Sequence, residues 1–215
     1  MIGYGLVIFD LDGTLMDTSE GIISSIRYTV NQMGFECPDD DTLKTFIGPP
    51  IQYTFEKYYD VHDDVLNKMS LIFREHYKDM DLLKAKPYDG IYECLRALND
   101  SGVTCAVATN KREDYALKLL KEFGFDRYMK VMHGSDFNGI LSKSDIIWLC
   151  IDESGIDDKS KILMVGDAAG DLKGANDAGI DFLPVTYGFG EFEKEDLKKY
   201  GTACSCGEIV RAVCE

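Results

Sequence analysis

Short, uninterrupted apolar runs constrain the fold of this chain more than any other feature of its sequence. The runs are too short for most helices, and apolar and polar residues do not alternate within them. Runs of this kind are typical of parallel strands that helices cover on both faces of a sheet. They occur at residues 6–9, 103–108, 162–165 and 182–185 and, in a weaker form, at 128–133.

Segments between these runs carry apolar residues at helical spacing, and several end at a glycine. Glycine readily adopts the left-handed conformation that often terminates a helix. Strands that alternate with amphipathic helices predict right-handed crossovers, and therefore an α/β fold with a doubly wound, Rossmann-like parallel sheet. The clearest helical segments are 91–98, 117–123 and 146–151, and the glycines that follow them are Gly102, Gly124 and Gly155.

The stretch 16–83 breaks this alternation, because it shows helical periods and no convincing buried strand. It begins soon after the first run, and its two crossings to the rest of the chain adjoin the end of the first strand. We therefore predict an all-helical cap domain at 16–83, placed as a lid over this edge of the sheet. Residues 1–15 and 84–215 are expected to form the Rossmann-like catalytic core.

The first helix of the cap has recognisable signals at both ends. Asp17 and Glu20 have the spacing of a capping box, with Asp17 in the cap position. Gly34 is in position to end the same helix.

The charge balance limits the partners of the chain. It has 23 basic and 38 acidic residues, a formal net charge of -15, which is the wrong sign for a nucleic-acid backbone. Its hydrophobic content of 45% is that of an ordinary soluble globular protein. Its first residues resemble neither a signal peptide nor a membrane span. We therefore expect no nucleic-acid polymer and no membrane among its partners.

The seven cysteines are an odd number and lack the density of a disulfide scaffold. This pattern predicts free thiols and a cytoplasmic protein. Cys204, Cys206 and Cys214 cluster near the end of the sequence, but they lack the usual zinc spacing and a fourth ligand.

Acidic residues follow two of the runs, at the edge where open α/β sheets collect their ligands. Asp10 and Asp12 follow the first run, and Asp167 and Asp171 follow the run at 162–165. Four carboxylates at one edge would repel one another and raise their pKa values unless a cation neutralised them. Mg²⁺ fits this role best, because it binds through a few carboxylates together with water and a substrate phosphate.

Donors suited to a phosphoryl group accompany these acids. Thr109 follows the run at 103–108, and Lys143 lies at the start of a predicted helix, whose N-terminus also favours an anion. Phosphoryl transfer needs such donors around the transferred oxygens. Lys111 and Lys161 are alternatives to Lys143, although Lys161 precedes its strand and is expected at the opposite edge of the sheet.

Four motifs stand in a defined order along the chain: Asp-Leu-Asp-Gly-Thr at 10–14, Thr-Asn at 109–110, Lys143, and Gly-Asp followed by Asp at 166–171. In this order they resemble the motifs of the haloacid dehalogenase-like hydrolases. The resemblance covers nearly the whole chain and includes a helical cap between the first and second motifs. Phe-Ile-Gly-Pro-Pro at 46–50 and Tyr-Gly-Phe-Gly at 187–190 resemble the phosphoglycolate phosphatase-like branch.

The resemblance implies a Mg²⁺-dependent phosphatase that hydrolyses small-molecule phosphate monoesters through an aspartyl-phosphate intermediate. It implies that Asp10 forms this intermediate, while Asp12 protonates the departing alkoxide and then deprotonates the hydrolytic water. The implied metal ligands are Asp10, the backbone carbonyl of Asp12 and Asp167, with Asp171 supporting the water shell, and the implied phosphoryl contacts are Thr109, the Asn110 amide and Lys143.

One departure and several alternatives accompany this interpretation. The family often has proline after the motif lysine, whereas Ser144 follows Lys143 here. A sugar phosphomutase of the beta-phosphoglucomutase type usually carries a histidine in the first cap helix, where this chain has Glu-Gly-Ile-Ile at 20–23. A carbon-halogen hydrolase needs no acid at the position of Asp12. From a different class, a phosphotransfer receiver domain could gather similar acids, but the second acid two residues after the first, the long helical insertion and the later acidic pair oppose it. A non-catalytic binding protein on the same fold is a further alternative, which the complete set of expected acids opposes.

The cap is expected to select the leaving group, and its sequence indicates no particular phosphate ester. Arg74 and Tyr77 are candidate cap contacts with the substrate. Nothing in the sequence resembles a coiled-coil seam, so a monomer is expected and a dimer is left open.

Overall fold

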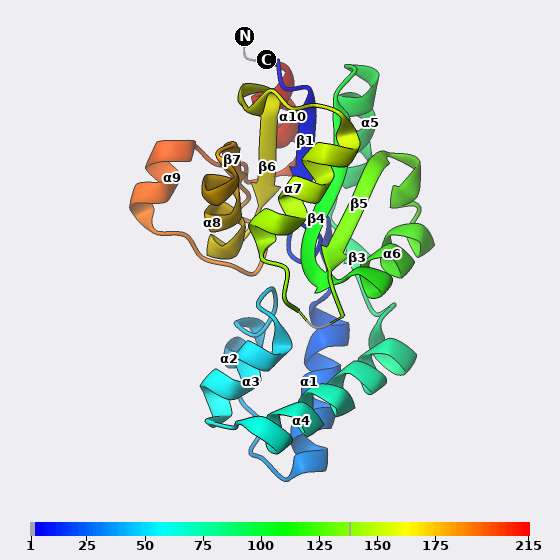
Figure 1. Cartoon of the computed structure of the whole chain (residues 1–215), viewed down its shortest axis with the longest axis vertical. Helices are drawn as coiled ribbons and strands as arrows, with labels where there is room; N and C mark the ends of the chain where they lie inside the picture. Colours follow the sequence, from blue (N-terminus) through cyan, green and yellow to red (C-terminus); the bar gives the residue numbers. More distant parts are fainter. Residues whose placement is uncertain (1–2, 138) are drawn as a thin grey trace.

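A sheet of five parallel strands forms the centre of the molecule (Figure 1). The structure, a computed structural model, describes residues 3–137 and 139–215, so the first two residues of the predicted core lie outside the described part. Each apolar run is a strand, as predicted, and the spatial order is β5, β4, β1, β6, β7. The bounds are β1 (Leu6–Phe9), β4 (Thr104–Arg112), β5 (Met129–Ser135), β6 (Ile162–Gly166) and β7 (Asp181–Pro184).

Helices cover both faces of this sheet, so the predicted doubly wound α/β fold is confirmed (Figure 1). The central strand β1 shows why: Val7 and Phe9 belong to one buried core, and Leu6 and Ile8 belong to the other. One face carries α5 (Ile91–Asp100), α6 (Glu113–Glu122) and α10 (Cys206–Cys214), and the other carries α7 (Lys143–Ser154) and α8 (Ala169–Ala178), with α9 (Lys194–Tyr200) beside β7 and the short 3-10 helices η2 (Phe125–Arg127) and η3 (Lys159–Lys161) in connections.

The predicted helix ends in the core are confirmed by backbone geometry. Gly102, Gly124 and Gly155 have φ values of 80°, 72° and 74°, the left-handed region that residues with a Cβ rarely adopt. Within the part of the chain that the structure describes, no helix has both the length and the apolar character needed to cross a membrane.

The stretch 16–83 is helical apart from a two-residue strand at its start, and its helices lie beyond the carboxyl ends of the sheet strands (Figure 1). Its own buried residues include Ile26, Phe55, Met69 and Phe73. Its role as a separately moving cap domain stays a prediction. The elements are β2 (Met16–Asp17), α1 (Ser19–Met33), α2 (Asp40–Lys44), α3 (Ile51–Tyr59), α4 (Asp63–His76) and the π-helix η1 (Tyr77–Asp81).

The predicted capping box at the start of α1 is wrong, although Gly34 ends this helix as expected. Asp17 lies in β2, which pairs in antiparallel fashion with β3 (Lys86–Pro87), so the helix starts later, with Thr18 at the cap position. The Asp17 carboxylate accepts hydrogen bonds from the backbone amide and the hydroxyl of Ser19, at 3.0 and 2.5 Å. The two-stranded ribbon, which the sequence did not predict, joins both crossings between the core and the helical stretch.

A polar cluster fastens the end of the helical stretch to α1. The buried Asp81 carboxylate pairs with Lys84 at 2.8 Å and accepts a hydrogen bond from Ser25, also at 2.8 Å. His76 lies 3.1 Å from the same carboxylate. Gly21 permits this close approach, because its amide donates to the Lys84 carbonyl and an added Cβ would overlap the Asp81 carbonyl.

We expect Gly21→Ala to lower the free energy of unfolding by about 1–3 kcal/mol, because the clash is with backbone atoms that cannot rotate away. Gly207→Ala in α10 is the matched control, since nothing lies within 4 Å of its added Cβ. The control should be neutral or stabilising, because alanine favours a helix more than glycine does. Urea unfolding of both variants checks this, and equal stability would contradict the proposed tight crossing.

Candidate active site

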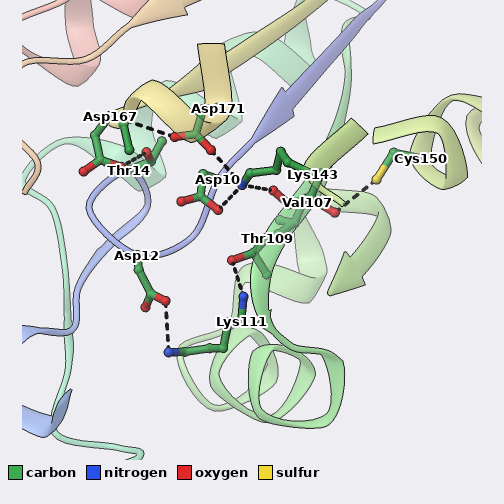
Figure 2. A network of polar contacts seen from close by, with 12 residues as sticks. Asp10, Asp12, Thr14, Val107, Thr109, Lys111, Lys143, Cys150, Asp167 and Asp171 are labelled. Carbon is green, nitrogen blue, oxygen red and sulfur yellow. Dashed lines mark hydrogen bonds and ion pairs between the residues drawn. The ribbon is translucent and has the colours of Figure 1, made fainter. Parts of the chain in front are cut away.

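Three buried carboxylates meet at the carboxyl edge of the sheet (Figure 2). Asp10 follows β1, Asp167 follows β6, and Asp171 belongs to the first turn of α8. Each offers an oxygen, and these oxygens all lie within 4.8 Å of one another. The sequence placed all three at this edge, because parallel strands β1 and β6 are neighbours and end together.

Burial and mutual repulsion raise the pKa values of two carboxyl groups in this cluster, those of Asp10 and Asp167. Burial raises the pKa of Asp10, the Lys143 ammonium lowers it, and the carboxylates of Asp171, Asp167 and Asp12 raise it further, for a net pKa of about 7. Burial and Asp171 also raise the pKa of Asp167. A hard divalent cation would offset this excess of negative charge, and an oxygen-only donor set with few protein ligands suits Mg²⁺.

Lys143 lies in this cluster, as the sequence predicted. Its ammonium donates to Asp10 at 2.8 Å and to the Ala108 carbonyl at 2.9 Å, and it pairs with Asp171 at 2.7 Å. Burial opposes its charge, but Asp10 and Asp171 hold the pKa of Lys143 above its usual range. The missing proline does not displace the lysine, because Ser142 and Asp145 form a capping box that starts α7 at Lys143.

The Asp12 carboxylate lies apart from these three acids (Figure 2). It accepts a hydrogen bond from the Thr18 hydroxyl at 2.7 Å and one from the Lys111 ammonium at 3.0 Å. Lys111, an alternative to Lys143 in the sequence, is thus also buried in the site, but beside the other aspartate. Lys161 is exposed and pairs with Asp158 near the start of β6, so it lies outside the site.

The end of β4 carries Thr109 and Asn110, the remaining residues predicted to contact the phosphoryl group. Thr109 is buried, and its hydroxyl oxygen accepts a hydrogen bond from the Lys111 amide at 3.2 Å (Figure 2). Toward the residues that the structure describes this hydroxyl donates no hydrogen bond, so its hydrogen can be donated to a ligand. Asn110 lines the adjoining pocket. The pairing of β4 with β5 is irregular between Ala108 and Arg112, the stretch where the strand presents these residues.

The loop at 187–190 positions Asp167, a role that the sequence did not indicate. The amides of Phe189 and Gly190 donate to Asp167 Oδ2 at 2.8 and 3.2 Å, and the Thr14 hydroxyl donates to Oδ1 at 3.1 Å. A Cβ on Gly188 would overlap the Asp167 side chain. The two glycines in Tyr-Gly-Phe-Gly were the available signal, because close backbone approach requires glycine.

A pocket opens beside Asp12, between the helical stretch and the core. Both candidate cap contacts, Arg74 and Tyr77, line it, and so do Phe46 and Phe73. The core contributes Asp12, Asn110, Lys111, Arg112, Tyr115 and the loop after β5. The pocket therefore reaches the carboxylate predicted to act as acid and base.

Comparison with known proteins agrees with this geometry. Residues 7–185 match the family described as haloacid dehalogenase-like hydrolase. The chain is 33% identical over 207 residues to a 5'-nucleotidase of Pseudomonas aeruginosa, covering 96% of this chain and 92% of that protein. It is 31% identical over 199 residues to a phosphoglycolate phosphatase of Agrobacterium fabrum, covering 90% and 85%. The crystal structure of a predicted phosphatase from Clostridium acetobutylicum matches with a TM-score of 0.90 and 32% identity over 98% of each chain.

The chain therefore belongs to the haloacid dehalogenase-like hydrolase family. The predicted resemblance to its phosphoglycolate phosphatase-like branch is confirmed, and the similar phosphatases support the predicted class of phosphoric monoester hydrolase. The roles of individual residues and the identity of the metal stay predictions.

We expect Mg²⁺ to stabilise the fold, because it would neutralise carboxylates that are buried only in the folded state. One bound ion at a hundred times its Kd adds about 2.7 kcal/mol to the free energy of unfolding. Asp167→Asn should lose most of this gain, whereas Asp152→Asn, a change at an exposed aspartate in α7, should keep it. Thermal unfolding with and without Mg²⁺ measures the difference. Equal Mg²⁺ shifts in both variants would argue against a metal at Asp167.

Proposed function

We propose that the protein is a Mg²⁺-dependent phosphatase that hydrolyses small-molecule phosphate monoesters of the phosphoglycolate type through an aspartyl-phosphate on Asp10. One observation carries this proposal: the two aspartates of the first motif lie in different environments. Asp10 lies in the acidic cluster with Lys143, while Asp12 is held by Thr18 and Lys111 beside the pocket. Such a division suits one carboxylate for nucleophilic attack and the other for proton transfer.

In the first step, an oxygen of Asp10 attacks phosphorus as the bond to the leaving oxygen breaks. The Lys143 ammonium, the Thr109 hydroxyl and the Asn110 amide hold the phosphoryl oxygens and offset their charge. Asp10, the Asp12 backbone carbonyl and Asp167 would hold Mg²⁺, with Asp171 in support, and the ion would supply further charge neutralisation. The loop amides on Asp167 keep that carboxylate in place.

Asp12 moves the protons in both steps. It protonates the leaving alkoxide in the first step, so that the alcohol departs neutral. It then takes a proton from water, whose oxygen bonds to phosphorus as the bond to Asp10 breaks, and inorganic phosphate is released. Thr18 and Lys111 fix the Asp12 carboxylate for both transfers, because each donates to a different oxygen.

The other candidate functions have less support. A phosphomutase of the beta-phosphoglucomutase type is disfavoured by the absence of a histidine at 20–23, and a receiver domain or binding protein would have no use for Asp12 beside a pocket. The cysteines are free, in keeping with the predicted cytoplasmic location. That location and the monomeric state stay predictions.

Asp10→Asn should reduce kcat for a generic aryl phosphate by more than about a thousandfold, because the amide oxygen is a far weaker nucleophile. Asp152→Asn is the control for the same chemical change on the surface. Phosphate release measured with excess Mg²⁺ gives the comparison. A loss below about tenfold, roughly 1.4 kcal/mol in the barrier, would remove Asp10 as the nucleophile.

Asp12→Asn should slow the hydrolysis of esters with poor leaving groups more than the hydrolysis of esters with good leaving groups. An alkyl alkoxide needs a proton as it leaves, whereas a nitrophenolate does not, so general-acid catalysis, typically worth about 10²–10⁴-fold, matters mainly for the former. The measurement is the rate of the first turnover with an alkyl phosphate and with a nitrophenyl phosphate. Equal losses for the two esters would show that Asp12 does not protonate the leaving group.

A further inference from the structure

Two cysteines line a second pocket, which opens between the ribbon of β2 and β3 and the segment before α10. Its volume is about 340 Å³, in the range of cavities that hold small molecules. Cys204 is exposed, whereas Cys206, the first residue of α10, is 2% exposed. The ribbon contributes Lys86 and Pro87 to the same pocket. The proposed reaction at the active site uses neither thiol.

The backbone presents these two thiols on one side of the chain. Ser205, which lies between them, is extended, with a φ of -156° and a ψ of 159°. Side chains two residues apart on an extended chain point to the same side. Their Cα atoms are about 6.6 Å apart, and a disulfide can bridge Cα atoms up to about 6.8 Å apart. Cys204 and Cys206 can therefore form a disulfide by rotation of their side chains.

Both thiols contact the start of the loop that holds Asp167. The Thr186 hydroxyl donates to Cys204 Sγ at 3.3 Å. The Cys206 thiol donates to the hydroxyl oxygen of the next residue, Tyr187, at 3.9 Å. The two sulfur atoms thus contact two consecutive residues of one loop.

Tyr187 connects these contacts to Asp167. Its hydroxyl donates to the Thr14 carbonyl at 3.1 Å, and the Thr14 hydroxyl donates to Asp167 at the same distance. Two residues after Tyr187, the Phe189 amide donates to Asp167 at 2.8 Å. The Tyr187 ring also packs on the Tyr88 ring, next to β3, with centroids 4.7 Å apart. A change at the two thiols therefore reaches Asp167 through direct contacts.

We propose that Cys204 and Cys206 form a modification site, at which a low-molecular-weight disulfide oxidises both thiols to an intramolecular disulfide that weakens the hold of the loop on Asp167. The site itself is independent of the proposed phosphatase function. Only the effect of oxidation on activity rests on that function.

Two exchange steps balance this reaction. Burial raises the pKa of the Cys206 thiol, whereas Cys204 is exposed, so Cys204 reacts first. Its thiolate attacks one sulfur of the small disulfide, and the other half leaves as a thiolate. The Cys206 thiolate then attacks the Cys204 sulfur of the mixed disulfide and releases the second half. The protein loses two protons and two electrons, and the small disulfide is reduced to two thiols.

Oxidation removes both contacts between the thiols and the loop. A disulfide has no S–H group, so the hydrogen bond from Cys206 to Tyr187 is lost. The new S–S bond draws the Cys204 sulfur away from Thr186. Hydrogen bonds with sulfur are weak, so we expect a looser loop and an otherwise intact fold.

Mass spectrometry tests whether the disulfide forms. Reduced protein is treated with oxidised glutathione, alkylated with N-ethylmaleimide in denaturant and digested with trypsin. Residues 200–211 form one tryptic peptide, which contains Cys204 and Cys206 and no other cysteine. This peptide should be lighter than its reduced form by two hydrogens and carry no alkyl group, while the buried Cys94 is alkylated. Two alkyl groups on the peptide, a stable glutathione adduct, or a link from Cys206 to Cys94 would overturn the site.

Amide hydrogen exchange tests the effect on the loop. In the oxidised protein the amides of 187–190 should exchange about three- to tenfold faster, while those of β6 keep their rates. Cys204→Ser cannot form the disulfide and keeps an oxygen that can accept from Thr186, so the oxidant should not change its exchange. Cys37→Ser, a change at an exposed cysteine of the helical stretch, is the matched control and should respond as the wild type does. Unchanged exchange in oxidised wild type, or an equal response in Cys204→Ser, would refute the link between the thiols and the loop.

Failure of this inference can be told apart from failure of the proposed function, because neither measurement needs Mg²⁺ or a substrate. Phosphate release from a generic aryl phosphate with Mg²⁺ is measured in parallel. Oxidation should lower the rate and dithiothreitol should restore it, and full activity of the oxidised protein would overturn the effect on Asp167. A reduced protein that releases no phosphate, but forms the disulfide and loosens the loop, would refute the phosphatase and leave the modification site standing.

Discussion

The ion pairs of Lys143 with Asp10 and Asp171 are the interaction on which the site depends. Three carboxylates are buried within reach of one another, and this single ammonium contacts two of them directly. Removing one partner of a buried pair typically costs about 3–5 kcal/mol, because the other charge stays buried and uncompensated. The start of α7, fixed by the Ser142 cap, therefore governs both the stability of this edge and the position of the nucleophile.

Close backbone packing supplies the second constraint, and glycines make it possible. Gly13 has a φ of 84°, and a Cβ there would overlap Asp167. Gly188 approaches the same carboxylate from the opposite loop, where a side chain would also clash. Gly174 leaves room for the stem of Lys143. Backbone atoms therefore lie close against Asp167, and unlike side chains they cannot make room by changing rotamer.

The sequence was informative where one local pattern determines the structure. Apolar runs predicted all five strands of the sheet, because a doubly covered strand must be continuously apolar, and the residues after these runs gave the acidic cluster. Partners that depend on three-dimensional packing escaped prediction, such as Thr18 on Asp12 and the loop amides on Asp167. The capping-box prediction at Asp17 failed because pairing of β2 with β3 moved the helix start, and a two-residue ribbon has no sequence period to detect.

The part of the site that surrounds the phosphoryl group and the part that the helical stretch contributes differ in which features of a substrate they can distinguish. The phosphoryl group, which every substrate of such an enzyme shares, would lie among Thr109, Lys143 and the three clustered aspartates. This part of the site therefore cannot distinguish one leaving group from another. The helical stretch contributes Arg74 and Tyr77 to the other part. Because Tyr77 contacts Lys111, which holds Asp12, the element that would recognise the leaving group is coupled by direct contact to the residue that would protonate it. Recognition of the substrate and placement of the acid are therefore physically linked through one lysine.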